Sequence, residues 1–122
     1  RLALREDDRV YNYAEIEEQT AKIASMLLAE GLQKGDRIAW IGKNSDLYFS
    51  LFYGAARVGI VMVPIGWRLA PAEWAFIAND TGARVLFTGR GFEGAGDVLA
   101  ELAGPLERVI AEDEARGLSV RR

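Results

Sequence analysis

The chain has 122 residues and a formal net charge of −3, from 15 Lys and Arg against 18 Asp and Glu, and it contains neither cysteine nor histidine. These absences exclude a disulfide frame, a thiolate nucleophile, a Ser-His-Asp triad and a zinc site with nitrogen and sulfur ligands. Half of the residues are hydrophobic, which is a globular composition, and the length fits one domain with one core.

Charge and hydropathy also restrict the partners and the compartment. The mild acidity argues against nucleic acid, because phosphate neutralisation needs Lys and Arg clustered on one face. The longest apolar run, residues 60–65, is far shorter than the ~20 residues that span a bilayer. No secretory-type segment opens the sequence, so we expect a soluble, cytoplasmic protein. The chain begins at Arg1 without an initiator Met and ends at Arg122, so we expect a piece of a longer polypeptide.

The first elements are a predicted hairpin and a predicted helix. Two short apolar runs within residues 2–13 flank an acidic predicted turn, Glu6, Asp7 and Asp8. Asn12 is a favourable N-cap, and Glu15 completes an Asn variant of the capping box. Gly31 ends the helix because glycine adopts positive φ at little cost. One helical face contains Ile16, Thr20, Ile23 and Leu27.

A strand and an apolar helix follow. Residues 37–42 form a short, mostly apolar run that predicts a strand. The next helix is capped by Ser45 or Asn44 and runs to Val58. It is apolar on nearly all sides, which predicts burial on more than one side.

The next segments predict a buried strand and a third helix. The continuous apolar run over residues 60–65 is typical of a strand covered on both faces, with Pro64 at its end. Pro71 suits the first turn of a helix that stops at Gly82. Three of its residues point inward: Trp74, Ile77 and Ala78.

The last third of the chain predicts two strands around a short helix. Residues 84–88 form a strand, 89–96 a glycine-rich loop, 97–103 a helix and 106–110 a fourth strand. The alternation of strands and helices predicts an α/β fold. Its sheet should be largely parallel and flanked by helices on both faces.

One motif suggests a nucleotide site. Residues 89–94 fit G-x-G-x-x-G through Gly89, Gly91 and Gly94, directly after a predicted strand, and Glu112 and Asp113 follow about twenty residues later, where a dinucleotide site has its ribose-binding acid. However, the predicted helix begins only after the motif, and Phe92 and Glu93 put bulk and negative charge where phosphates would lie. A flexible loop is therefore the preferred interpretation.

Three other polar segments also have an ordinary interpretation beside the functional one. Residues 42–45, Gly-Lys-Asn-Ser between a strand and a helix, are either an anion site or a turn with a helix cap. Trp67 and Arg68 follow a buried strand, where open α/β sheets bind ligands, or else pack against another domain. The carboxylates at 15–18 and 112–114 are a cap with a solvated face and an acidic loop, rather than a catalytic pair.

Six segments, in order, resemble the start of an adenylate-forming enzyme, the family of acyl-CoA synthetases, peptide-synthetase adenylation domains and luciferases. Residues 11–16, YNYAEI, are similar to the signature L-T-Y-x-E-L, with Asn12 in place of Thr or Ser. Residues 56–65, ARVGIVMVPI, are similar to L-K-A-G-x-x-x-V-P-L, with Arg57 for Lys and Val58 for Ala. The other segments are 35–39, 44–45, 68–69 and 82–86.

The resemblance implies a partial N-terminal AMP-binding domain over residues 1–122, truncated at its C-terminal end. It implies a ligase that joins a carboxylic acid to ATP, as in fatty acid metabolism, and passes the acyl group to the thiol of coenzyme A, with Mg²⁺ as metal. The family's Ser/Thr/Gly-rich loop ending in Pro-Lys-Gly is absent from this sequence. We therefore assign no catalytic, cofactor-binding or metal residue, and expect this segment alone to bind no cofactor and to be inactive.

Two other functions stay open. One is a dinucleotide-binding segment of an oxidoreductase, based on Gly89, Gly91, Gly94 and Glu112. The other is a non-catalytic interaction module whose partner covers the sheet edge and the surfaces of Trp67 and Trp74. The expected partners are the remainder of its own polypeptide, a carboxylic acid substrate and a possible second copy in a homo-oligomer. The acid, the thiol acceptor and the oligomeric state cannot be read from the sequence.

Overall fold

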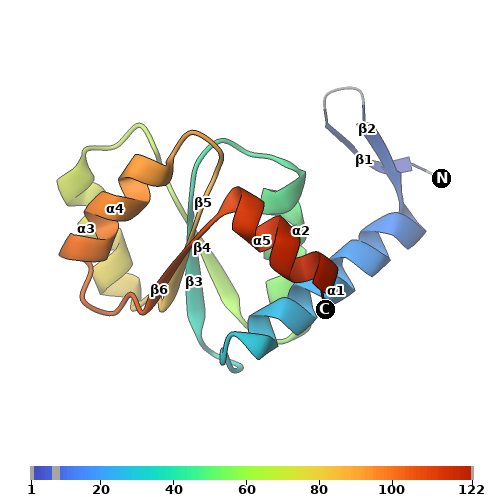
Figure 1. The fold of residues 1–122 in the computed structure, drawn as a ribbon, viewed down its shortest axis with the longest axis horizontal. Helices are drawn as coiled ribbons and strands as arrows, with labels where there is room; N and C mark the ends of the chain where they lie inside the picture. Colours follow the sequence, from blue (N-terminus) through green and yellow to red (C-terminus); the bar gives the residue numbers. More distant parts are fainter. Residues whose placement is uncertain (1, 7–8, 122) are drawn as a thin grey trace.

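A computed structural model describes residues 2–6 and 9–121, and its elements follow the predicted alternation of strands and helices (Figure 1). The elements are β1 (Leu2–Glu6), β2 (Arg9–Asn12), α1 (Tyr13–Ala29), β3 (Arg37–Ile41), α2 (Asp46–Arg57), β4 (Val61–Ile65), α3 (Pro71–Thr81), β5 (Val85–Thr88), α4 (Glu93–Leu102), β6 (Arg108–Ala111) and α5 (Glu112–Arg121).

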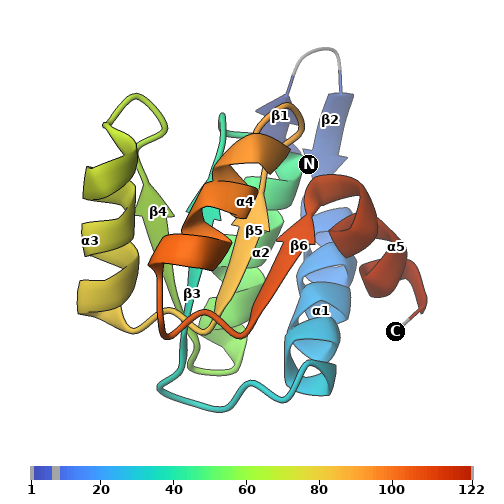
Figure 2. The same cartoon turned by 60° about the vertical axis from the view of Figure 1, so that its left-hand side comes forward.

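Four strands form one parallel sheet in the order β4-β3-β5-β6. Helices α1, α2 and α5 cover one face, and α3 and α4 cover the other (Figures 1 and 2). The predicted α/β class with a parallel sheet is therefore confirmed. The antiparallel pair β1-β2 forms the predicted hairpin beside the start of α1. Two residues of its predicted turn, Asp7 and Asp8, lie outside the described residues.

The alternation of side chains along β3 divides the core between the two faces of the sheet. Ile38 and Trp40 are buried with α1, α2 and α5, whereas Ala39 and Ile41 are buried with α3 and α4. Such burial on both faces explains why this central strand is a continuous apolar run.

Helix α2 packs closely on α1 through Gly54. A Cβ atom at Gly54 would lie 2.6 Å from Cγ2 of Ile23, so only glycine allows this approach without movement. Ser45, not Asn44, caps α2, because its Oγ accepts the backbone N–H of Tyr48 at 3.2 Å.

One burial prediction is confirmed and another is wrong. Helix α2 is buried on more than one side, against α1 and against the sheet, although Phe52 and Tyr53 are exposed. Strand β4 is an edge strand, and Val61 and Pro64 are exposed rather than covered. Pro64 is tolerated there because an edge strand does not need every N–H for pairing.

One helix starts earlier than predicted, and another helix was not predicted. Helix α4 begins at Glu93, inside the segment predicted as a loop, so the motif at residues 89–94 does open a helix. Residues Glu112 to Glu114 form the first turn of α5 rather than an acidic loop. Negative charge is favourable in that first turn because the helix dipole is positive there. Strand ends shift by one or two residues, as in β6.

The start of α3 lacks a side-chain cap, and this gives a first testable prediction. Ala70 occupies the N-cap position with extended backbone, and Glu73 accepts its backbone N–H at 3.2 Å. Replacing Ala70 with serine supplies a hydroxyl acceptor for the first turn, so the free energy of unfolding should rise by about 1 kcal/mol in urea titrations. Ala72→Ser places serine two residues further along, inside the first turn of α3, and should instead lower the free energy of unfolding by roughly 0.5 kcal/mol. If the free energy of unfolding falls in both variants, the inference that α3 gains from a side-chain cap is wrong.

Candidate functional site

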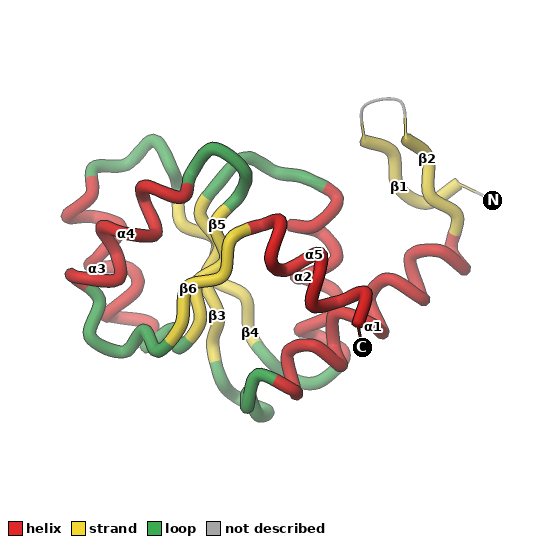
Figure 3. The backbone as a smooth tube through the Cα atoms, viewed as in Figure 1, coloured by secondary structure: helices red, strands yellow, loops and turns green. Residues whose placement is uncertain are grey.

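The carboxyl ends of the strands place three sequence-predicted segments at one edge of the sheet. The connection from β3 leads to β4 on one side, whereas β5 and β6 lie on the other, so the strand order reverses between β3 and β5. Open α/β sheets bind ligands at such a switch point. The loops after β3 and β5 lie together there (Figure 3), and the N–H of Gly89 donates to the carbonyl of Ile41 at 2.9 Å.

An open cleft of about 630 Å³ lies beside this switch point. Trp67 lines it, and the ring of Trp67 carries the guanidinium of Arg68 at 4.7 Å and the ammonium of Lys43 at 5.7 Å from the ring centroid. Phe92 packs against the same ring at 5.4 Å. The cleft is lined by Trp40, Gly42, Lys43, Asn44, Tyr48, Pro64, Ile65, Gly66, Trp67 and Arg68.

Three of the segments that the sequence singled out therefore meet at Trp67. Lys43 comes from the loop after β3, Arg68 from the loop after β4, and Phe92 from the segment after β5. Cations held over aromatic faces are stabilised by the ring quadrupole. The expectation that Trp67 and Arg68 shape a cleft is consistent with this geometry. Trp74, on α3, does not join them; its Nε1–H donates to the carbonyl of Gly66, and its half-buried side chain packs against the smaller core cluster.

Trp40 forms the floor of the cleft. It is 1% exposed, its Nε1–H donates to the carbonyl of Gly42 at 3.3 Å, and Tyr48 meets it edge to face at 5.7 Å. Gly42 and Gly89 touch above this ring, since a Cβ at Gly42 would lie 2.9 Å from Cα of Gly89. The two switch-point loops thus close directly on each other.

The glycine motif is not open to phosphate in this structure. The N–H of Arg90 donates to Oε1 of Glu112 at 3.0 Å, and the N–H of Gly91 donates to both carboxylate oxygens of Glu93 at 3.1 and 3.3 Å. Carboxylates of the chain itself thus hold the amides that a pyrophosphate needs. The dinucleotide alternative gains no support from this loop, although the helix does begin within it.

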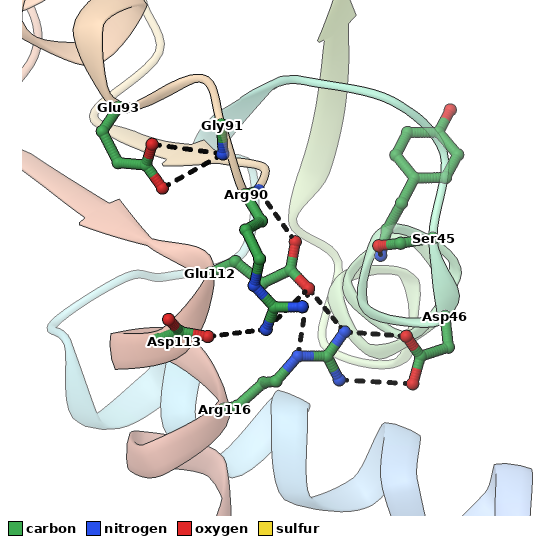
Figure 4. Close-up of polar contacts among 9 residues, drawn as sticks. Ser45, Asp46, Arg90, Gly91, Glu93, Glu112, Asp113 and Arg116 are labelled. Carbon is green, nitrogen blue, oxygen red and sulfur yellow. Dashed lines mark hydrogen bonds and ion pairs between the residues drawn. The ribbon is translucent and has the colours of Figure 1, made fainter.

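A charge cluster joins α5 to the cleft loops (Figure 4). Arg116 contacts Asp46 at 2.7 and 3.2 Å and Glu112 at 2.7 and 3.1 Å. The bonds to Asp46 raise the pKa of Arg116 against the effect of burial, and those to Glu112 raise it further. Beside them, the hydrogen bond from Arg90 lowers the pKa of Asp113. This cluster was not predicted from the sequence; its one local signal was the i,i+4 spacing of Glu112 and Arg116.

A second cluster occupies the opposite edge of the sheet. Arg84 contacts Asp36 at 2.6 Å and Glu107 at 2.9 and 3.0 Å, and each of the three directly precedes a strand. A backbone hydrogen bond from Gln33 lowers the pKa of Asp36, and Arg84 lowers it further. Arg84 likewise lowers the pKa of Glu107. The amino ends of β3, β5 and β6 are thereby tied together, away from the cleft.

The remaining carboxylates behave as the sequence predicted only in part. Glu18 is exposed and pairs with Lys22 at 3.1 Å, as expected of a solvated face. Asn12 caps α1, since its Oδ1 accepts the N–H of Glu15 at 2.8 Å. Glu112, in contrast, is buried.

The fold and the cleft define a doubly wound α/β protein of the kind that binds ligands at the carboxyl ends of its strands. The chain belongs to the AMP-binding enzyme family, whose model matches residues 1–119. The resemblance to adenylate-forming enzymes is confirmed, and the match is to the N-terminal part of these larger proteins.

Individual proteins that are similar to this chain are consistent with its membership of this family. The fatty acid–acyl-carrier-protein ligase ScoC of Streptomyces coeruleorubidus is 36% identical over 110 residues, covering 89% of this chain and 21% of that protein. The long-chain-fatty-acid–CoA ligase FadD13 of Mycobacterium tuberculosis is 44% identical over 77 residues, covering 63% and 15%. A solved Mycobacterium tuberculosis fatty acyl CoA synthetase superposes with a TM-score of 0.87 at 34% identity, covering 93% and 23%. The chain thus spans about a fifth of the length of these relatives.

Within the part of the chain that the structure describes, no helix has the length and apolar character needed to cross a bilayer.

Proposed function

We propose that this chain is the N-terminal scaffold of an acid–thiol ligase. The complete enzyme would join a carboxylic acid to the α-phosphate of ATP, release pyrophosphate, and pass the acyl group from the acyl-adenylate to a thiol. Membership of the AMP-binding enzyme family over residues 1–119 carries this proposal. The names of the relatives favour a fatty acid as substrate and leave both coenzyme A and a carrier protein as acceptors.

The contribution of these 122 residues is structural rather than catalytic in this proposal. Arg84 and Arg116 are each paired with two carboxylates, so neither has a free face for a reacting phosphate. The amides of Arg90 and Gly91 are bonded to carboxylates. These groups do not fit ATP or Mg²⁺, so the phosphate loop, the metal ligands and the reactive lysine of the enzyme are assigned to residues outside this chain.

The proposal predicts where activity resides. The complete gene product should catalyse exchange of labelled pyrophosphate into ATP only when a carboxylic acid is present, with fatty acids of different lengths as the first panel. The 122-residue chain by itself should give no exchange above the blank, because it lacks a phosphate loop. Exchange by the short chain would refute the scaffold role, and absence of exchange in the complete product with every acid tested would refute the ligase.

A further inference from the structure

Helix α5 is connected to both loops that meet at the switch point, although it lies behind the cleft. Arg116, on the second turn of α5, reaches the carboxylate of Asp46, the first residue of α2. It also bonds Glu112, the first residue of α5 (Figure 4). A single guanidinium thus connects α5 to the start of α2, 70 residues away along the chain.

One of these carboxylates bonds a cleft loop, and the other directly follows a cleft loop in the chain. Glu112 uses its other oxygen to accept the N–H of Arg90, two residues before Phe92, which packs on Trp67. Asp46 directly follows Ser45, the cap of α2, and the loop of Lys43 and Asn44 that lines the cleft. The positions of both loops therefore depend on the positions of two carboxylates.

The burial of the cluster makes the guanidinium necessary. The side chains of Asp46 and Glu112 are 9% and 7% exposed, whereas that of Arg116 is 30% exposed. Without Arg116 each of these buried carboxylates loses two hydrogen bonds to a cation, although Arg90 still lies 3.8 Å from Glu112. Loss of such bonds at a buried site costs more than the loss of an exposed pair. Arginine can bond both at once because its guanidinium is planar and has five donors, whereas a lysine ammonium is a point charge.

We propose that Arg116 is a positioning residue that holds the loop after β3 and the loop after β5 in the arrangement that forms the cleft. Its loss should release the two loops together while leaving the sheet intact. Only the use of the cleft by the enzyme rests on the proposed function; the coupling of α5 to the loops does not.

Arg84 offers a matched control within the same domain. It also bonds two carboxylates, Asp36 and Glu107, but at the amino ends of the strands. Arg84→Met and Arg116→Met therefore remove the same chemistry from opposite edges of the sheet. A merely structural role for Arg116 would give both variants the same general loosening, without preference for the cleft loops.

Hydrogen exchange followed by mass spectrometry separates these outcomes by segment, in the complete gene product. Arg116→Met should speed exchange of the amides in residues 42–48 and 89–92 by at least about tenfold, with little change in residues 33–37 and 104–108. Arg84→Met should give the reverse pattern. Arg116→Lys should restore protection at only one of the two cleft loops, because one ammonium cannot replace both bidentate contacts.

Glu112→Gln provides a second, milder variant. Its amide oxygen can still accept the N–H of Arg90, and Arg116 keeps its two bonds to Asp46, so exchange in both cleft loops should rise less than in Arg116→Met. Equal acceleration in all four segments, or unchanged cleft loops in Arg116→Met, would overturn the proposal. Because exchange is measured without substrate, that result would leave the ligase proposal unaffected, and failure of pyrophosphate exchange would leave the coupling unaffected.

Discussion

Replacement of Trp40 with alanine is expected to lower the free energy of unfolding by about 4 kcal/mol, since large-to-small changes of buried aromatic residues cost roughly 3–5 kcal/mol. Trp40 is 1% exposed, lies in the larger core cluster, and supports both Gly42 and Tyr48 at the cleft. The cavity left behind cannot be refilled easily, because β3 is the central strand that pairs with both β4 and β5. Urea titrations followed by far-UV circular dichroism measure the change.

Trp74→Ala is the matched control for this prediction. Trp74 also donates its Nε1–H to a loop carbonyl, that of Gly66 at 3.1 Å, but its ring is only half-buried. Its removal should therefore cost only about 1–2 kcal/mol. Equal losses for Trp40 and Trp74 would show that the floor of the cleft is not part of the main core.

Local sequence patterns were sufficient to predict the order of the elements from β1 to β6, but not helix α5 or the start of α4. Gly94 and Gly96 are poor helix formers, so the segment resembled a loop. The structure explains Gly96 by packing, because a Cβ there would lie 2.9 Å from Cγ2 of Thr88 and 3.0 Å from Cγ1 of Val109. A glycine that the sheet requires for close approach of a helix cannot be distinguished from a loop glycine without the sheet.

The charge cluster was not predictable for a different reason. Asp46 and Arg116 come together only because α2 and α5 cover the same face of the sheet. The acidic run at residues 112–114 has a composition that fits either an exposed loop or the first turn of a helix. In the structure it is the first turn of α5, and Glu112 is buried. Charge patterning identifies local pairs, whereas long-range pairs depend on topology.

The convergence on Trp67 was predictable in part. Each of the three segments follows a predicted strand, and parallel strands bring their carboxyl ends to one edge, so a shared site was a fair expectation. The strand order was not available from the sequence. It is the placement of β3 between β4 and β5 that brings Lys43, Trp67 and Phe92 together.

The contact between Gly42 and Gly89 should be the most sensitive point of this arrangement. Gly42→Ala is expected to lower the free energy of unfolding by about 3 kcal/mol, from backbone strain at φ of +154° and from a Cβ placed 2.9 Å from both N and Cα of Gly89. Backbone atoms cannot rotate away as a side chain can. The hydrogen bond from Gly89 to Ile41 must lengthen, and β3 and β5 must separate at the cleft.

Gly35→Ala isolates the contribution of backbone strain alone. Gly35 also has positive φ, at +92°, but nothing lies within 4 Å of its Cβ position, so the expected loss is about 1–2 kcal/mol. The difference between the two variants in urea titrations then measures the steric cost of opening the switch point. If that difference is zero, the two loops can separate without cost, and close contact between them cannot be what gives the cleft its shape.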